Sequence, residues 1–231
     1  MIENLLVLGA GSAGLIAAIS LKKKLPQLNV RIVRSPSIGV ISVGESTTPN
    51  FPRHIFEYLG IPRKRFYQLA QPTWKLGIRF LWGPRGSFDY TFQPQLDTQW
   101  TDLSKPTGFY CDDEFTNVSL PGALMNQGMA FPRQQDGAPE IHHWHAFHIE
   151  NKKFVDVLEL VARELGIEFI DGEMDSAERG GKGISAIHLK DGRRLEADFF
   201  VDASGFRAEL IGKVLETPFI SFEKSLFCDR A

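Results

Sequence analysis

The feature that most restricts the fold is a glycine-rich turn at residues 9–14, Gly-Ala-Gly-Ser-Ala-Gly. Residues 3–8 before it form a short apolar run typical of a buried parallel strand, and residues 12–24 are rich in Ala and Leu and end in three lysines, as a helix does. In this setting the glycines permit a tight turn, close approach of a pyrophosphate and close helix packing. A glycine-rich turn without a ligand is the alternative. The residues expected to hold a dinucleotide are Gly9, Gly11, Ser12, Ala13 and Gly14.

The elements that follow predict an α/β protein. Residues 28–34 alternate and predict a second strand, so the chain opens with a β-α-β unit and a parallel sheet. Further expected elements are helices at 52–59 and 152–165, strands at 73–82, 167–170 and 198–202, and a hairpin of 183–189 and 194–197 turning at Asp191-Gly192. Residues 83–139 show no sustained period and are expected to be irregular with a few strands. The predicted fold is an FAD/NAD(P)-binding, Rossmann-like parallel sheet with an inserted β-rich layer on the substrate side.

Composition excludes several classes of protein. The chain has 231 residues, 43% hydrophobic and 23% charged, which is typical of a globular protein and not of a disordered one. Its net charge of -2 provides no basic field for nucleic acid or an anionic membrane. The apolar stretch at 5–21 contains three glycines and is followed by lysines, so we expect neither a signal peptide nor a membrane span. Cys111 and Cys228 are too few for a disulfide framework, and a cytoplasmic location is expected.

The end of the second predicted strand lacks the acidic residue that commonly binds an adenosine ribose. Arg34 stands there, followed by Ser35. An arginine at this position is compatible with a 2′-phosphate and therefore with NADP, but a solvent-facing side chain, or contact with adenine or another phosphate, explains it as well. Arg34 is therefore assigned to the cofactor site without a specific partner.

Two further motifs carry polar residues in loops. The first, Gly44-Glu45-Ser46-Thr47-Thr48-Pro49, is explained by a polar turn when it is taken alone. The second places Asp202 at the end of a buried strand, with small residues up to Gly205. That arrangement brings a carboxylate and a stretch of backbone to the carboxyl end of a parallel sheet, where cofactors bind.

Residues 73–82, Thr-Trp-Lys-Leu-Gly-Ile-Arg-Phe-Leu-Trp, alternate between apolar and basic. On a continuous strand, Lys75, Gly77 and Arg79 share one face, and Gly77 leaves space beside the lysine. The pattern alone is typical of a strand whose basic residues face water. A functional lysine is the alternative.

In combination, these motifs resemble those of the flavin-dependent halogenases, the tryptophan halogenase family. Their order and spacing match the family over essentially the whole chain. The glycine motif is common to flavoproteins, whereas the G-E-S-T segment and the lysine strand are more specific. The residues that carry the resemblance are G-A-G-S-A-G at 9–14, V-G-E-S-T-T-P-N at 43–50, L-G-I-P at 59–62, W-K-L-G-I-R-F at 74–80, V-D-A-S-G-F-R at 201–207 and L-F-C-D-R-A at 226–231.

The resemblance implies a cofactor and a chemistry. The cofactor is FAD, present as FADH2 during turnover, and halide ion is a co-substrate. A flavin C4a-hydroperoxide oxidises the halide to hypohalous acid, which passes through a tunnel to a lysine that hydrogen-bonds it or captures it as a haloamine. Lys75 falls at the position of this catalytic lysine. Residues 37–48 resemble a loop between the flavin and substrate sites, which implies flavin contacts for Gly44, Glu45, Ser46, Thr47 and Pro49.

The resemblance also implies partners and leaves alternatives. The substrate is an electron-rich aromatic molecule of the tryptophan, indole, phenol or pyrrole type. A separate NAD(P)H-dependent flavin reductase supplies FADH2. The oligomeric state is left open, and a homodimer is one of the alternatives. Family members are longer, and their W-x-W-x-I-P signature, a functional glutamate and a halide-binding Thr/Ser-Gly pair are expected beyond Ala231. One alternative is an aromatic hydroxylase or reductase of the same fold, which does not need the lysine. The other is an FAD-binding fragment without activity of its own.

The remaining expectations concern organisation and single residues. Residues 1–72 and 150–231 are expected to form the nucleotide-binding parts, and 73–149 the substrate-side insertion. His145 and His148 are three residues apart and could share a helical face, but matching Cys or carboxylate spacings are missing. A packing or capping role is therefore favoured and no metal is expected. Trp74 either lines a substrate pocket or packs in the core.

Overall fold

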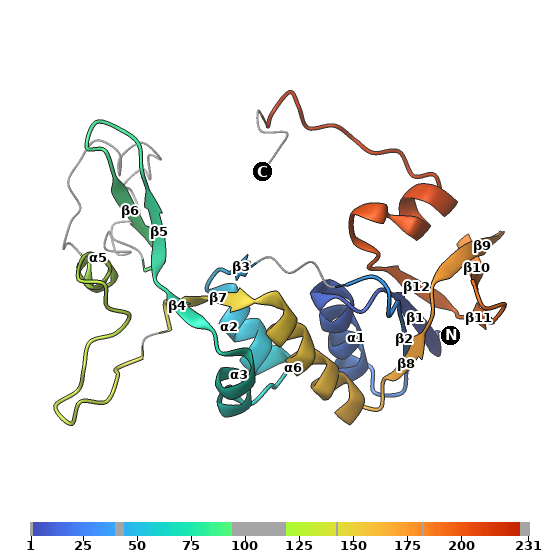
Figure 1. The fold of residues 1–231 in the computed structure, drawn as a ribbon, viewed down its shortest axis with the longest axis horizontal. Helices are drawn as coiled ribbons and strands as arrows, with labels where there is room; N and C mark the ends of the chain where they lie inside the picture. The colour runs from blue at the N-terminus through green and yellow to red at the C-terminus, as the bar shows by residue number, and fades with distance from the viewer. Residues whose placement is uncertain (1, 40–43, 94–118, 142, 182, 227–231) are drawn as a thin grey trace. The chain divides into compact units, whose positions relative to one another are not determined.

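The computed structural model describes residues 2–39, 44–93, 119–141, 143–181 and 183–226 (Figure 1). The chain divides into two compact units: unit 1 contains Met1–Ile41 and Val155–Ala231, and unit 2 contains Ser42–Phe154. Residues 42–72, grouped above with the nucleotide-binding parts, thus belong to unit 2. The expectations that fall outside the described residues are those for Cys111 and Cys228, for residues 40–43 and 227–231, and for residues 94–118 of the insertion.

Unit 1 is built on a parallel sheet, as the β-α-β pattern predicts. Helix α1 (Ser12–Lys24) begins and ends at the predicted residues. Because the four strands run in one direction, their carboxyl ends open on one edge, where Leu8 lies opposite Val33 and Asp202. That edge carries the glycine turn and the start of the segment after Asp202. The strands lie in the order β12 (Phe199–Asp202), β1 (Asn4–Leu8), β2 (Asn29–Arg34) and β8 (Glu168–Asp171).

The apolar stretch at 5–21 is thus divided between a strand and a helix of a buried layer. Its strand residues and the inner face of α1 are almost completely buried. No helix in the described part of the chain is long and apolar enough to cross a membrane.

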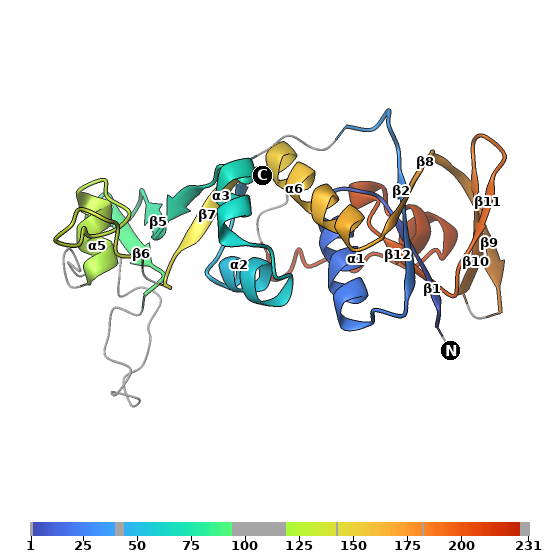
Figure 2. The same ribbon diagram turned by 90° about the horizontal axis from the view of Figure 1, so that it is seen from below.

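Unit 1 also contains a three-stranded antiparallel sheet (Figure 2), in the order β11 (Arg194–Glu196), β10 (Gly183–Leu189) and β9 (Met174–Gly180). The predicted hairpin is confirmed, and its turn has Gly192 at φ +88°. Strand β9 was not predicted, because its sequence has few apolar residues. The strand owes its extended conformation to pairing with β10. One buried cluster joins both sheets: Leu6, Leu8, Val33, Ile170, Ile187, Leu189 and Leu210.

Unit 2 contains a small antiparallel sheet next to short helices. The predicted helix at 52–59 begins at Asn50 and ends in a π-helical turn, and the helix predicted at 152–165 lies one residue earlier. Strands β3 and β7 and helix α3 were not predicted. The sheet order is β3 (Gly44–Ser46), β7 (Ala146–Glu150) and β4 (Thr73–Lys75), and the helical segments are α2 (Asn50–Arg53), η1 (His54–Tyr58), α3 (Arg63–Ala70) and α6 (Asn151–Glu164), which runs on into unit 1.

Aromatic rings form the core of unit 2. Phe66 of α3 and Phe147 of β7 are fully buried, with ring centroids 5.4 Å apart. The two ring planes are tilted by 51°, and aromatic pairs at such distances stabilise a core beyond the area that they bury. Further rings in contact with this pair are Phe51, Phe56, Tyr67 and Phe154.

The prediction of one continuous strand at 73–82 is wrong. The chain forms β4 and then β5 (Gly77–Phe80), separated at the buried residue Leu76. Strand β4 pairs with β7, whereas β5 pairs with β6 (Phe88–Thr91), so Lys75 and Arg79 belong to different sheets. Gly77 does not leave free space, because a Cβ there would lie 2.4 Å from the carbonyl oxygen of Tyr90. This glycine instead permits close approach of β6.

The described part of the insertion at 83–139 is partly regular. Strand β6 completes the hairpin with β5, and helix α5 (Leu120–Asn126) packs beside it (Figures 1 and 2). A single bridge joins Arg133 and Pro139. The helix was not expected, since its sequence Leu-Pro-Gly-Ala-Leu-Met-Asn contains two helix-breaking residues; proline is tolerated there because it lies in the first turn.

Candidate functional site

Close backbone contacts shape the glycine turn that follows β1. Gly9 has φ +114°, and a Cβ on it would lie 2.2 Å from the carbonyl oxygen of Ala203. A Cβ on Gly14 would lie 2.0 Å from the carbonyl oxygen of Gly9. The turn and the packing of α1 therefore require both glycines, in agreement with the tight turn and close helix packing that the motif predicts.

Gly11, at the N-cap of α1, has different surroundings. No described atom lies within 4 Å of the position that its Cβ would take. The first turn of α1 has no acidic residue, and no side chain caps the helix. Free amides and the positive end of the helix dipole favour an anion at such a position. The residues Gly11, Ser12 and Ala13 thus fit the pyrophosphate of a dinucleotide.

The carboxylate of Asp202 organises the loop that follows β12. Its Oδ1 accepts the amide of Ser204 at 3.1 Å, and its Oδ2 accepts the amides of Leu210 at 2.8 Å and Ile211 at 2.9 Å. Burial alone raises the pKa of Asp202, but the hydrogen bonds from Ser204, Ile211 and Leu210 outweigh it and lower the pKa. The side chain therefore caps the π-helical segment η3 (Glu209–Val214).

Gly205 is the accessible part of this loop. It begins the 3-10 turn η2 (Gly205–Arg207) at φ +67°, and its Cβ position meets no described atom within 4 Å. A ligand at the carboxyl edge of the sheet would thus meet backbone at Gly205, whereas the Asp202 carboxylate is already engaged by protein donors.

Arg34 ends β2 and is held by two carboxylates of unit 1. Its Nε donates to Asp171 Oδ1 at 2.8 Å, and its Nη1 lies 3.1 Å from Glu159 Oε2. The hydrogen bond to Asp171 and the charges of both carboxylates raise the pKa of Arg34 against the opposing effect of burial. A cofactor phosphate would have to compete with both carboxylates. The structure therefore gives Arg34 a partner that the sequence left open.

Thr47 fixes the segment Gly44–Pro49 to β7. Its amide donates to the carbonyl oxygen of Phe147 at 2.9 Å, and its Oγ1 accepts the amide of Phe147 at 2.9 Å. Before it, Gly44 and Glu45 pair with β7 as strand β3, and after it Pro49 directly precedes α2. The segment is thus the end of a strand that is hydrogen-bonded to β7 and leads directly into α2, and not a free polar turn.

Lys75, at the end of β4, is directed toward this segment. Its Nζ donates to Ser46 Oγ at 2.8 Å and to the carbonyl oxygen of Thr47 at 3.1 Å. The Phe92 ring centroid lies 5.2 Å from Nζ, within the range of a cation–π contact. Burial lowers the pKa of the Lys75 ammonium. The structure thus joins two motifs that lie 28 residues apart in sequence, and it shows Lys75 as a half-buried side chain with protein acceptors.

Two residues near Lys75 could not be found from the sequence. Ala146 lies opposite Lys75 on β7 and is fully buried. Phe92 follows β6 and reaches the ammonium from the neighbouring hairpin. Neither belongs to a motif, and only the pairing of β4 with β7 and of β5 with β6 brings them to the lysine.

The opposite face of β4 belongs to the aromatic core. The Trp74 ring lies 4.3 Å from Phe131, 4.6 Å from His145 and 5.2 Å from Phe147 between centroids. Of the two interpretations of Trp74, core packing therefore describes its surroundings. The expectation of a shared helical face for His145 and His148 is wrong. His148 lies on strand β7 and His145 directly precedes it, so a spacing of three puts the side chains on opposite faces.

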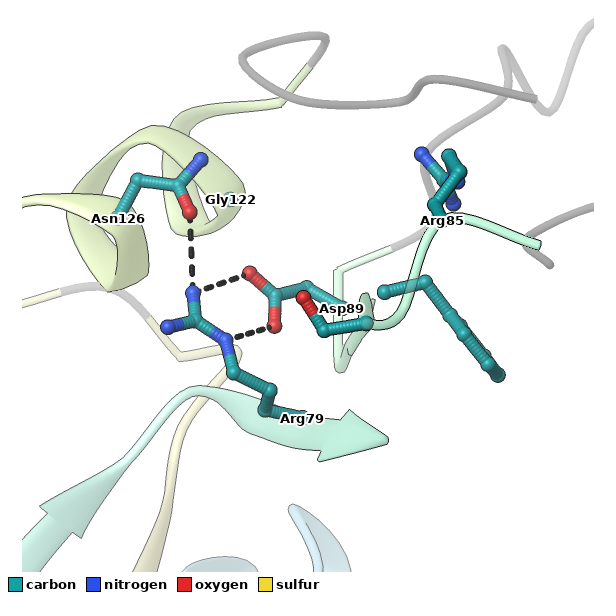
Figure 3. A pocket seen from close by; sticks show the side chains of 7 residues that line it. Arg79, Arg85, Asp89, Gly122 and Asn126 are labelled. Carbon is teal, nitrogen blue, oxygen red and sulfur yellow. Dashed lines mark hydrogen bonds and ion pairs between the residues drawn. The ribbon is translucent and has the colours of Figure 1, made fainter. Parts of the chain in front are cut away.

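A polar pocket lies between the β5–β6 hairpin and α5 (Figure 3). Arg79 donates from Nε and Nη2 to the two oxygens of Asp89, each at 2.7 Å, and from Nη2 to Asn126 Oδ1 at 3.0 Å. The hydrogen bond that Arg79 donates to Asp89 raises the pKa of Arg79. The guanidinium thus ties α5 to the hairpin. The pocket is lined by Arg79, Arg85, Ser87, Phe88, Asp89, Gly122 and Asn126.

Metal ligands do not gather in the described ranges, where no group of three or more His, Cys, Asp or Glu side chains could hold a metal ion.

The parallel sheet, the glycine turn and the open helix N-terminus define a dinucleotide-binding α/β protein. The model of the tryptophan halogenase family matches residues 4–231, and the chain belongs to that family. The tryptophan 7-halogenase KtzQ of Kutzneria sp. (strain 744) is 30% identical over all of this chain and 47% of its own length. The tryptophan 7-halogenase RebH of Lentzea aerocolonigenes is 29% identical, again over 47% of its length.

Solved structures show the same relationship. MibH, a lanthipeptide tryptophan 5-halogenase, is 34% identical with a TM-score of 0.84, over 98% of this chain and 44% of MibH. The tryptophan 6-halogenase SttH of Streptomyces toxytricini is 25% identical with a TM-score of 0.80, over 97% of this chain and 48% of SttH. The chain thus spans about half the length of the relatives it matches.

Proposed function

We propose that the protein is an FADH2-dependent halogenase of electron-rich aromatic substrates and that Lys75 is its catalytic residue. The observation that carries this proposal is the position of the Lys75 amine, 2.8 Å from Ser46 Oγ in the G-E-S-T segment. A hydroxylase or reductase of the same fold does not need such a lysine. Membership of the tryptophan halogenase family supports the same class.

The residues proposed to hold FAD come from several turns. The amides of Gly11, Ser12 and Ala13 would bind the pyrophosphate, because they lie at the open N-terminus of α1. When bound in its reduced form, FAD would react with dioxygen to provide the oxidant that converts halide to hypohalous acid. The other residues assigned to the cofactor are Gly9, Gly14, Arg34, Gly44, Glu45, Ser46, Thr47, Pro49, Asp202 and Gly205.

Lys75 can act on hypohalous acid in either of two protonation states. As an ammonium it donates a hydrogen bond to the oxygen and directs the halogen to the substrate. As a neutral amine it forms an N–halogen bond, while its proton and the hydroxide of hypohalous acid leave as water. Burial lowers the pKa of Lys75 and so increases the fraction of neutral amine at a given pH. The substrate receives the halogen in place of a ring proton.

The names of the relatives guide the choice of substrate. KtzQ and RebH are tryptophan 7-halogenases, and MibH is a lanthipeptide tryptophan 5-halogenase. An indole ring, as in tryptophan, is therefore the first substrate to test, ahead of phenols and pyrroles. A separate NAD(P)H-dependent flavin reductase is proposed to supply FADH2.

The test is halogenation by the complete protein. With a flavin reductase, NADH, FAD, oxygen and bromide, it should brominate tryptophan or indole, as measured by mass spectrometry. Lys75→Ala should abolish brominated product while flavin reoxidation continues. Lys64→Ala, which removes an exposed lysine from α3, is the matched control and should retain product. Equal bromination by Lys75→Ala would refute the catalytic role.

A further inference from the structure

Ser46 and Lys75 lie on the two outer strands of the sheet β3-β7-β4. Ser46 is opposite His148 and Lys75 is opposite Ala146, so both side chains occupy one face of the sheet. Neighbouring strands lie about 4.8 Å apart, and the lysine stem must therefore cross the whole width of β7. It crosses at Ala146, whose small and fully buried side chain leaves room for it.

The two hydrogen-bond acceptors of the Lys75 amine differ in conformational freedom. The carbonyl oxygen of Thr47 is a fixed acceptor, because the amide and hydroxyl of Thr47 are both hydrogen-bonded to Phe147. The hydroxyl of Ser46 is exposed and can rotate. An ammonium has three donors, and within the described residues Ser46 and Thr47 accept two of them, so one N–H is left there without a hydrogen-bond acceptor.

We propose that Ser46 is a positioning residue for Lys75: its hydroxyl, together with the Thr47 carbonyl, orients the amine so that its remaining N–H meets the oxidant. This inference rests on the proposed function, in which Lys75 acts on hypohalous acid and residues 44–49 contact the flavin. It adds that this segment also sets the direction of the lysine, through two hydrogen bonds.

A positioning role has a signature in the titration of Lys75. Acceptors stabilise the ammonium, whereas burial lowers its pKa, so the two effects oppose each other. Removing the Ser46 hydroxyl should therefore lower the pKa of Lys75 further, by about 0.5–1 unit. Neighbouring titratable groups are Glu45 on β3, which faces the other side of the sheet, and His148 and Glu150 on β7, which share the face of Lys75.

The experiment is an NMR titration of the protein labelled with [13Cε]lysine, in which Lys75→Arg identifies the Lys75 resonance. Ser46→Ala should lower the pKa of Lys75, and Ser46→Thr, which keeps a hydroxyl, should restore it. Thr73→Ala removes a hydroxyl from the same face of β4, and His148→Gln removes the imidazole that lies opposite Ser46 on that face; both should leave the pKa of Lys75 unchanged. An unchanged pKa in Ser46→Ala, or equal shifts in Ser46→Ala and Thr73→Ala, would overturn the proposal.

A second readout separates positioning from general damage. In the halogenation assay, Ser46→Ala should yield about fivefold less brominated product per flavin oxidised, a ratio that is corrected for any change in flavin oxidation itself. If Ser46→Ala shifts the pKa but Lys75→Ala still brominates, the proposed function fails and the positioning contact stands. If Lys75→Ala is inactive and Ser46→Ala matches the wild type in both readouts, the positioning role fails alone.

Discussion

Gly11 and Gly14 lie three residues apart in the same turn, yet alanine should act differently at each. At Gly14 the new Cβ would lie 2.0 Å from a backbone oxygen, so the turn must move, and we expect a loss of about 3 kcal/mol in the free energy of unfolding. At Gly11 the Cβ meets no described atom within 4 Å, and the loss should stay below about 1 kcal/mol.

The same pair separates folding from binding. Because the methyl group of Gly11→Ala would occupy the position proposed for the pyrophosphate, FAD affinity should fall at least about tenfold without unfolding. Urea denaturation measures the stability of both variants, and quenching of flavin fluorescence measures affinity. Unchanged FAD affinity in Gly11→Ala would remove the N-terminus of α1 from the cofactor site.

Asp202 supports stability through the charge on its carboxylate. Asp202→Asn keeps one oxygen but replaces the other, so one or more of the amides of Ser204, Leu210 and Ile211 loses an acceptor. We expect a loss of about 1.5–3 kcal/mol at pH 7, measured by urea denaturation. Glu209→Gln changes a charge on the same helical segment without touching these amides and is the matched control.

The destabilisation of Asp202→Asn should also depend on pH. The folded-state pKa of Asp202 lies below its ordinary value, so the ionised carboxylate stabilises the fold above the ordinary pKa of about 3.9. That contribution is lost as the pH falls through the lower, folded-state pKa. The stability difference between Asp202→Asn and the wild type should therefore shrink below about pH 4. A difference that stays constant from pH 7 to pH 3 would contradict the capping role.

At the scale of elements, α3 shows how a helix without a clear sequence signal becomes part of the core. Its Phe66 is fully buried against Phe147 of β7, so Phe66→Ala should cost about 3–5 kcal/mol in urea denaturation. Tyr58, on η1, is 55% exposed, and Tyr58→Ala should stay within about 0.5 kcal/mol. Equal effects of the two substitutions would mean that α3 does not pack as described.

The elements that the sequence predicted share strong local signals. β1, α1, β2, α6 and the β10–β11 hairpin have apolar periodicity, terminal glycines or a turn dipeptide, and these properties act within a few residues. In contrast, β3 and β7 are strands because of partners that lie far along the chain, and β9 is a strand because it pairs with the adjacent strand β10. The break at Leu76 has the same origin, since β4 and β5 pair with different strands.

The candidate site divides in the same way. Lys75 and Ser46 were selected from the sequence by resemblance, but only the three-stranded sheet brings them to hydrogen-bonding distance. The central strand of that sheet, β7, lies about 70 residues beyond Lys75 in the sequence. Asp202 and Arg34 were selected as polar residues at strand ends. Their contacts with protein donors and carboxylates depend on η3, α6 and β8, whose side chains no local pattern connects to them.

At the scale of the whole molecule, the residues assigned to the cofactor fall in both units. Gly9–Gly14, Arg34, Asp202 and Gly205 belong to unit 1, and Gly44–Pro49 belongs to unit 2. A ligand that binds only the native state stabilises it by about 2.7 kcal/mol when its concentration is one hundred times its dissociation constant. Backbone amides whose local unfolding the bound ligand opposes then exchange their hydrogens with solvent more slowly. FAD should therefore slow hydrogen exchange both in residues 9–15 and in residues 44–51.

Exchange followed by mass spectrometry, with and without FAD, tests this prediction, and the β10–β11 hairpin serves as the internal control because no cofactor residue is assigned to it. Gly11→Ala should weaken the protection in both segments, since it lowers the affinity for the flavin on which both depend. Protection limited to residues 9–15 would confine the cofactor to unit 1 and exclude residues 44–49 from flavin contact. In that case the hydrogen bond between Lys75 and Ser46 would still be a contact within unit 2, but the segment that accepts it would not contact the flavin.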